Sequence, residues 1–178
     1  GGGPETVVLL HEAGGSLESW DAVALLLQPR FRVLRYDQRG FGMSERANKL
    51  SLADMVADLA ALLAALTLCD RPVHLVGTAI GASIAIAFAA AHPTRVTRLV
   101  AASPVTGGLP PAALQSLELR AQSAERDGMR AVADSSLARS YPPRLRGNGD
   151  AFEQYRRRFL CNDPGSFAAL SRAYGSID

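Results

Sequence analysis

The residues of this sequence best suited to do chemistry are 77–81, Gly-Thr-Ala-Ile-Gly. They follow a short apolar run, 73–76, and precede an apolar run that ends at Ala91, so the pattern predicts a strand, a sharp turn and a helix. This is the layout of a nucleophile elbow, Gly-x-Ser-x-Gly, whose serine hydroxyl is lifted above the sheet. Gly77 and Gly81 match the glycines that let strand and helix come close. The central residue is alanine, so the elbow lacks its attacking oxygen.

A serine at position 79 would attack an acyl carbon, whereas the methyl group of Ala79 cannot. Three interpretations stay open: a deliberate replacement of serine that traps a ligand, a natural loss of catalysis, or a tight strand–helix connection that is not an elbow. Thr78 and Ser83 are poor substitutes, because one lies beside the apex and the other a turn into the helix.

Two other polar loops follow predicted strands. Residues 11–16, His-Glu-Ala-Gly-Gly-Ser, come after the buried run 6–10, and residues 37–44, Asp-Gln-Arg-Gly-Phe-Gly-Met-Ser, come after 31–36. Open parallel sheets bind ligands at the carboxyl ends of their strands. We therefore expect both loops and the elbow to meet at one edge of a sheet.

The elements that must position these loops alternate between strands and helices, which predicts a parallel sheet with right-handed crossovers. Ser16 or Ser19 caps a helix that Pro29 ends, and Ser51 opens a capping box with Asp54. The expected strands are 6–10, 31–36, 73–76 and 96–102. The expected buried helix faces are Trp20, Val23, Leu26 and Leu27, then Leu52, Met55, Val56, Leu59, Leu62, Leu63 and Leu66.

Beyond a hinge-like break at 107–111 the pattern is only helical. We interpret this part as a helical lid inserted after the fourth strand. The expected helices are 112–125, 128–139, 151–160 and 166–174.

The three loops, taken in order, resemble the α/β-hydrolase family. Residues 7–16 look like its strand and oxyanion loop, 37–44 like its Asp-x-Arg-Gly-x-Gly-x-Ser turn, and 77–81 stand where its elbow belongs. Within the family the sequence is most similar to the 3-oxoadipate enol-lactonases. The segments that carry this closer likeness are 128–134 and 163–169, followed by Asp178.

The resemblance implies an α/β-hydrolase fold, a mostly parallel sheet flanked by helices with an inserted helical lid. It divides the chain into a core, 1–106, a lid, 107–165, and a return helix, 166–178. The family builds eight strands, and the four found here match its third to sixth. Its first hairpin is then expected before Gly1, and the last two strands, which supply the catalytic acid and histidine, after Asp178.

The resemblance also assigns roles around the elbow. The backbone N–H groups of Ala13 and Ile80 are expected to form the oxyanion hole. Glu12 replaces the family's usual glycine, and its carboxylate would oppose negative charge there unless it points to solvent or pairs with an arginine. His11 matches a histidine that holds the loop, and it joins Glu12 and Ser103 as residues expected near the ligand.

Arginines are frequent in the predicted lid, and their planar forks bind carboxylates well. We expect one of Arg130, Arg139 and Arg144 to face the pocket and most of the others to be solvated. An anionic lactone or acid would suit such a site, as in the enol-lactonases.

No histidine of this sequence fits the place of a general base. His74 lies inside a buried strand, and His92 ends the elbow helix at its far end. Asp37 and Arg39 are expected to tie their turn together by hydrogen bonds.

The activity implied is hydrolysis of a carboxylic ester or lactone, most specifically an enol-lactone, through an acyl-enzyme on residue 79 and without a cofactor. The chain as written is expected to be inactive, because nucleophile, acid and base are absent from it. The alternative is a non-catalytic pseudoenzyme that binds a small molecule.

Composition excludes several other classes. The net charge of +2, without aromatic residues interleaved among the arginines, argues against nucleic acid, and neither a Walker nor a dinucleotide motif is present. Cys69 and Cys161 lack metal-site spacing and are expected as reduced thiols of a cytoplasmic protein. No run is long enough to span a membrane. A homo-oligomer is left open, because the sheet edges of so short a chain need covering by a partner or by further segments.

Overall fold

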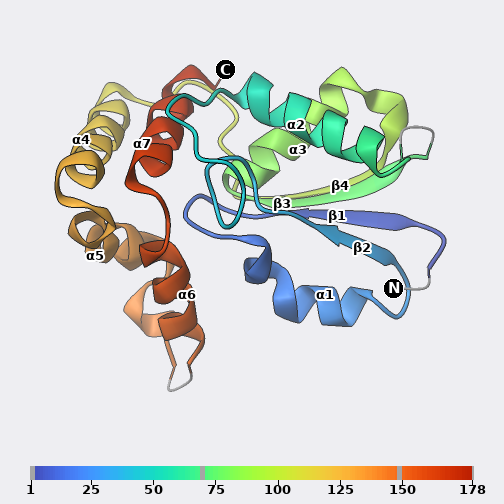
Figure 1. The fold of residues 1–178 in the computed structure, drawn as a ribbon, viewed down its shortest axis with the longest axis horizontal. Helices are drawn as coiled ribbons and strands as arrows, with labels where there is room; N and C mark the ends of the chain where they lie inside the picture. Colours follow the sequence, from blue (N-terminus) through green and yellow to red (C-terminus); the bar gives the residue numbers. More distant parts are fainter. Residues whose placement is uncertain (1–2, 69–70, 148–149, 178) are drawn as a thin grey trace.

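The computed structural model describes residues 3–68, 71–147 and 150–177. Its sheet has four parallel strands in the order β2-β1-β3-β4 (Figure 1). The crossed order and the parallel pairing confirm the predicted α/β class, and every predicted strand is present. The strands are β1 Thr6–Leu10, β2 Arg32–Arg35, β3 Val73–Thr78 and β4 Val96–Ala102.

Helices cover both faces of the sheet, α2 and α3 on one side and α1 on the other (Figure 1). Strand β1 is buried on both faces, because Val8 and Leu10 belong to the larger apolar core while Val7 and Leu9 pack in a smaller one with Trp20. This explains its unbroken apolar sequence. The elements of these layers are η1 Leu17–Trp20, α1 Asp21–Leu27, α2 Leu52–Ala65, α3 Ile80–Ala91 and η2 Pro93–Arg95.

The prediction of which residues the first helix buries is partly wrong. Trp20 and Ala24 are buried, but Leu26 is 79% exposed and Val23 is 37% exposed. The element begins as the 3-10 turn η1, capped by Ser16, before it becomes α1. Since a 3-10 turn has fewer residues per turn than an α-helix, the face projected from a single helical period is rotated.

The capping box at the start of α2 is confirmed. The Ser51 hydroxyl accepts a hydrogen bond from the Asp54 N–H at 3.1 Å, and the Asp54 carboxylate accepts one from the Ser51 N–H at 3.1 Å. Met55, Leu59 and Leu63 form the buried stripe. Leu66, predicted to belong to that stripe, follows the end of the helix and is 44% exposed.

Strand β4 forms one outer edge of the sheet. From Thr97 to Ala102 every residue of it is exposed, including Leu99 at 38% and Val100 at 56%. The expectation that the sheet presents uncovered edges therefore holds for β4 among the described residues.

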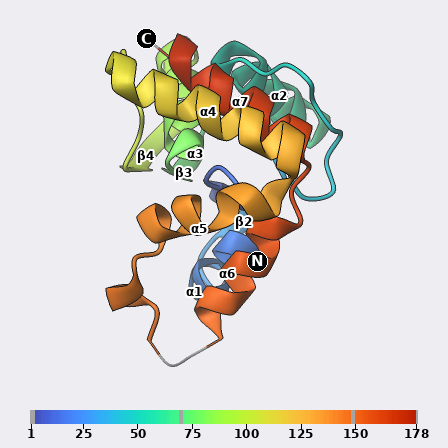
Figure 2. The same cartoon turned by 90° about the vertical axis from the view of Figure 1, so that its left-hand side faces the viewer.

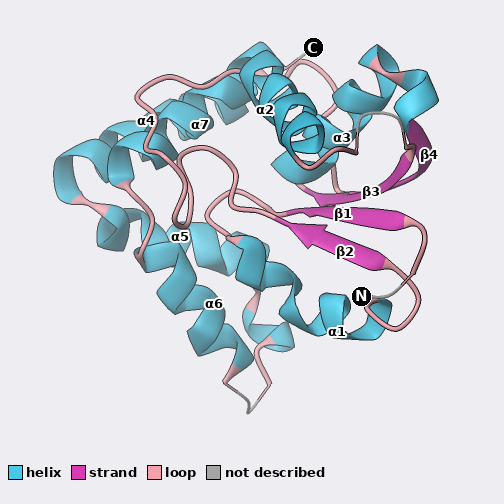
Figure 3. Ribbon diagram, turned by 45° about the vertical axis from the view of Figure 1, so that its right-hand side comes forward, coloured by secondary structure: helices cyan, strands magenta, loops and turns pink. Residues whose placement is uncertain are grey.

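Four helices, which we call the cap helices, lie beyond the carboxyl ends of the strands (Figures 1 and 2). They agree with the predicted helical segments to within a few residues, and Figure 3 shows that this side of the molecule holds only helices and loops among the described residues. The division into three units remains a prediction. The cap helices are α4 Pro111–Asp127, α5 Met129–Ser140, α6 Ala151–Leu160 and α7 Pro164–Ala173, with the 3-10 turns η3 Pro143–Leu145 and η4 Tyr174–Ser176.

Helices α4 and α7 lie side by side and are fastened by ion pairs (Figure 2). Arg172 on α7 donates to Glu118 at 3.0 Å and to Glu125 at 2.6 Å, both on α4. The joint from α4 to α5 is a single residue, Gly128, with φ +79° and ψ 177°. Only glycine adopts this region readily, and no atom lies within 4 Å of where its Cβ would stand.

Candidate active site

Ala79 forms the turn between β3 and α3 with φ +50° and ψ −117°, a conformation rare for residues with a side chain. A Cβ atom at Gly77 would overlap the backbone of Gly81, and one at Gly81 would overlap the backbone of Leu10. At Gly77 and Gly81 the backbone of α3 therefore packs directly against the backbone of β1 and β3, with no room for a side chain. This strained turn is the geometry of a nucleophile elbow, and it disfavours an ordinary strand–helix connection.

The two hydroxyls nearest to Ala79 in sequence do not replace a serine at the apex. Ser83 donates to the carbonyl of Val105 at 2.8 Å and accepts from its N–H at 3.0 Å, so its hydroxyl fixes the loop after β4. Neither Thr78 nor Ser83 lines the cavity at the apex.

His11 is wholly buried beneath the loop that follows β1. Its Nε2 accepts the Gln38 N–H at 3.0 Å, its Nδ1 lies 2.8 Å from the Glu12 carbonyl, and the Gln38 side chain donates to the His11 carbonyl at 2.7 Å. Burial lowers the pKa of His11, which keeps the ring neutral. His11 therefore holds the loop and does not line the cavity at the apex, which corrects its inclusion among ligand-binding residues.

Glu12, the residue that departs from the family pattern, does line that cavity. Its carboxylate accepts a hydrogen bond from the Ser19 hydroxyl at 3.0 Å. It forms no ion pair with an arginine in the described residues. A side chain at Gly15 would collide with this carboxylate, so Gly15 leaves room for it. Glu12 thus places a negative charge beside the elbow.

The cavity over the elbow has a volume of about 350 Å³ and lies between the core and the cap helices. Its walls are mostly apolar, with a few polar groups, as is usual for small-molecule sites. A larger cavity of about 490 Å³, between residues 15–18, 42–43 and α6, does not include Ala79. We assign the candidate site to the smaller one because it contains the apex. It is lined by Glu12, Ala13, Ala79, Val105, Leu109, Ala113, Leu117, Arg120, Ser136, Arg139, Ser140, Tyr155, Phe159, Phe167 and Tyr174.

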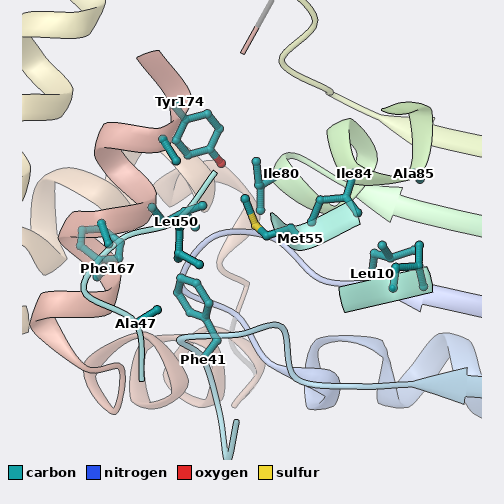
Figure 4. Packing of buried hydrophobic residues seen from close by; sticks show 14 of the residues in the cluster. Leu10, Phe41, Ala47, Leu50, Met55, Ile80, Ile84, Ala85, Phe167 and Tyr174 are labelled. Carbon is teal, nitrogen blue, oxygen red and sulfur yellow. The ribbon is translucent and has the colours of Figure 1, made fainter. Parts of the chain in front are cut away.

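The predicted oxyanion donors flank the apex, since Ala13 lines the cavity and Ile80 is the next residue after Ala79. Figure 4 shows the Tyr174 hydroxyl directed toward Ile80, and the Ile80 backbone N–H acts to lower the pKa of this phenol. Burial raises the pKa of Tyr174 to about 12, so the phenol is neutral at ordinary pH. One of the two predicted donors therefore lies beside a polar side chain of the protein.

All three predicted arginines are exposed, and of them only Arg139 also lines the cavity, whereas Arg130 and Arg144 lie outside it. Ser103, also predicted near the ligand, is exposed with φ +52° and does not line the cavity. Sequence reasoning did not single out Arg120, which comes from α4 with its guanidinium 5.4 Å above the Phe167 ring.

The turn at 37–44 supports the loop after β1 from outside the cavity. Asp37 accepts the N–H groups of Leu17 at 2.7 Å and Met43 at 3.0 Å, and Arg39 pairs with Asp58 on α2. These contacts connect the loop, the turn and α2, which agrees with the structural role expected for Asp37 and Arg39.

The remaining titratable candidates lie away from the apex. His74 is 3.5 Å from Glu5, and His92 packs against Phe88, so none of the described histidines lines the cavity. Within the described ranges no group of three or more His, Cys, Asp and Glu is placed to hold a metal ion, and no helix there is long and apolar enough to cross a membrane. Cys161 is an exposed free thiol, while Cys69 and Asp178 lie outside the described residues.

Comparison with known proteins agrees with the fold and the elbow described above. Residues 5–142 match the family model described as alpha/beta hydrolase fold. The solved enol-lactonase from Burkholderia xenovorans LB400 superposes with a TM-score of 0.87 and 26% identity, covering 100% of this chain and 67% of that one.

Two curated relatives match part of the chain more closely in sequence. The putative carbamate hydrolase RutD of Yersinia enterocolitica is 41% identical over 99 residues, 54% of this chain and 35% of the relative. A 2-hydroxy-6-oxononadienedioate/2-hydroxy-6-oxononatrienedioate hydrolase of Pseudomonas putida is 38% identical over 117 residues, 62% of this chain and 40% of the relative. The chain thus spans well under half of the length of these curated relatives.

Proposed function

Since the chain belongs to the α/β-hydrolase family, we propose that the cavity over Ala79 binds a small carboxylic ester or lactone, in the manner of an enol-lactonase-like hydrolase. The observation that carries this proposal is the strained elbow at the floor of the cavity, with φ +50° at residue 79. The fold brings a residue to that apex for attack on a carbonyl carbon.

Alanine at the apex stops the reaction at its first covalent step. A serine oxygen would add to the acyl carbon, the alcohol would leave, and water would release the acid from the acyl-enzyme. Ala79 has no oxygen or electron pair to form that bond. The chain as written is therefore proposed to bind its ester or lactone without cleaving it by this route.

Restoring serine tests the proposal. We expect the Ala79→Ser variant, in a protein that also carries the acid and histidine expected after Asp178, to be acylated by aryl esters and phosphonylated by fluorophosphonates, with the added mass located on residue 79 by mass spectrometry. The unchanged chain should bind the same esters in calorimetry without any mass gain. Ala113→Ser is the matched control, because it adds a hydroxyl to the same cavity wall but not at the apex.

The outcomes separate the alternatives. Esters that bind both forms without acylating the serine introduced at position 79 would favour a non-catalytic binding protein. Failure of every ester and lactone to bind would contradict the proposal.

One observation favours the second candidate, a small-molecule binding protein without catalysis. The Tyr174 hydroxyl points toward Ile80, whose backbone N–H an oxyanion would need. A hydroxyl in that position competes with a developing oxyanion for the same donor.

Removing the Tyr174 hydroxyl measures how much this contact matters. In the Ala79→Ser background, Tyr174→Phe should remove the hydroxyl that competes for the Ile80 N–H and accelerate acylation by roughly tenfold or more, since one oxyanion donor is commonly worth about 10²–10³. Stopped-flow or mass-resolved acylation rates provide the measurement. A slower or unchanged rate would show that the hydroxyl does not block the donor.

A further inference from the structure

Glu12 carries the one carboxylate among the described residues that line the elbow cavity. In that part of the chain the carboxylate accepts a hydrogen bond from the Ser19 hydroxyl, at 3.0 Å, and forms no ion pair with an arginine. The hydrogen bond fixes the carboxylate in place, and its other oxygen remains available. A carboxylate with a free oxygen beside a cavity can take a proton from a molecule bound there.

Among the described residues of the cavity wall, no other group can act as a base at ordinary pH. Burial raises the pKa of Tyr155 and of Tyr174, so both phenols stay neutral. Arg120 and Arg139 are cations that donate hydrogen bonds and accept none. The described histidines do not line the cavity. General-base chemistry at this site therefore depends on Glu12.

A backbone donor lies directly beside this base. Ala13 follows Glu12 in the chain and lines the same cavity, and its N–H donates to no other described residue. The Ala79 methyl group at the turn below brings no nucleophile. A carbonyl compound bound here would find a hydrogen-bond donor for its oxygen and a base for a neighbouring C–H group, but no oxygen at residue 79 to attack its carbon.

The charge of Glu12 distinguishes between two reactions of such a compound. When a nucleophile adds to the carbonyl carbon, negative charge develops on the oxygen while Glu12 stays charged, and the two charges repel each other. When Glu12 itself removes a proton from the neighbouring carbon, the carboxylate becomes a neutral acid as the enolate forms. The residue that hinders acyl transfer therefore favours enolate formation.

We propose that the elbow cavity catalyses enolisation, with Glu12 as the base, of a carbonyl compound that carries a C–H group next to its carbonyl. The carboxylate takes that proton, the C–H electron pair becomes a C=C bond, and the C=O π pair moves onto the oxygen beside the Ala13 N–H. Return of the proton to carbon restores a carbonyl compound, so the net reaction is an isomerisation or epimerisation that consumes no oxidant or reductant. This activity goes beyond ester binding, because it needs no nucleophile at residue 79.

Deuterium exchange into ketones tests the proposal, since a ketone has no leaving group and cannot be hydrolysed. Phenylacetone and cyclohexanone are incubated with the full chain in heavy water, and proton NMR follows the loss of the C–H signals next to the carbonyl. For at least one ketone, exchange above the buffer background should be about 100-fold faster with the unchanged chain than with Glu12→Gln, as is typical of a positioned general base. The glutamine keeps the size of the side chain and an oxygen that can accept from Ser19.

Glu18→Gln is the matched control for this experiment. It removes an exposed carboxylate of η1 that lines the larger cavity, outside the elbow cavity, and should leave the exchange rate unchanged. Glu12→Asp keeps the carboxylate but withdraws it by one methylene group, and should give a rate between those of the unchanged chain and Glu12→Gln. Thermal unfolding of each variant confirms that the rates come from folded protein.

Methyl phenylacetate, which has both an ester and an acidic C–H group, separates this inference from the proposed function. If it binds in calorimetry but neither it nor a ketone shows exchange that depends on Glu12, the base is overturned and the ester pocket stands. If a ketone exchanges in a Glu12-dependent manner while no ester or lactone binds, the base is supported and the ester pocket is contradicted. Release of methanol that depends on Glu12, without exchange, would show that the carboxylate acts on water, which also overturns enolisation.

Discussion

Replacing Gly81 with alanine is expected to destabilise the protein by roughly 3 kcal/mol or more, which would leave little of the stability of a typical domain. The added methyl group would overlap the carbonyl of Leu10, which is backbone and cannot rotate away. Relief requires α3 to move off β1, and that would open the larger apolar core around Ile80 and Ile84 (Figure 4). Urea denaturation followed by circular dichroism measures the loss.

Gly107→Ala is the matched control for this prediction. No atom lies within 4 Å of the Cβ position at Gly107, so the same methyl group should change the unfolding free energy by no more than about 0.5 kcal/mol. If Gly81→Ala were as stable as Gly107→Ala, the inference that α3 packs too closely on β1 for a side chain at position 81 would be contradicted.

Acidification is expected to destabilise the protein through His11. The folded state keeps this buried ring neutral and lowers its pKa, whereas the unfolded chain takes up a proton near the ordinary value of about 6.5. The unfolded state therefore binds more protons below that pH, and stability falls as the pH falls, by up to about 1.4 kcal/mol per pH unit. The decline should continue down to the lowered pKa of the folded state, where protonation ends the hydrogen bond from Gln38.

The measurement is the urea midpoint between about pH 7 and pH 5.5 in wild type and in His11→Gln. The variant should be less stable at pH 7 by about 2 kcal/mol, because buried partners lose their hydrogen bonds, and its stability should depend less on pH. His92→Gln, at the far end of α3, should retain the wild-type slope. Equal slopes in wild type and His11→Gln would contradict a neutral, buried His11.

The strands, helices and turns of the fold can be predicted from the sequence, because the signals for them depend on residues that are neighbours in the chain. The capping box at Ser51 and the glycines around Ala79 satisfy backbone geometry within a few residues. The first helix is harder to predict, since the 3-10 turn that shifts its face has no clear marker in the sequence.

The cavity wall could not be predicted in the same way, because it depends on how separate helices pack. Arg120 and Arg130 look alike as cap arginines, and only the pairing of α4 with α7 places the first over Phe167. Tyr174 gives a weak signal, since it follows the apolar face of the last predicted helix. From the sequence, the Glu12 carboxylate is expected either to face solvent or to pair with an arginine. In the structure it instead accepts a hydrogen bond from the hydroxyl of Ser19, in the turn that follows.

The single-residue joint at Gly128 has a consequence for the size range of ligands. Arg120 stands on α4, which Arg172 fastens to α7, while Arg139 stands on α5 beyond the joint. Buried side chains of α5, such as Met129, Val132 and Leu137, pack in the larger core, so packing as well as the backbone of Gly128 sets the spacing between the two guanidinium groups. We therefore expect the cavity to prefer ligands within a narrow range of lengths, because packed helices form its wall.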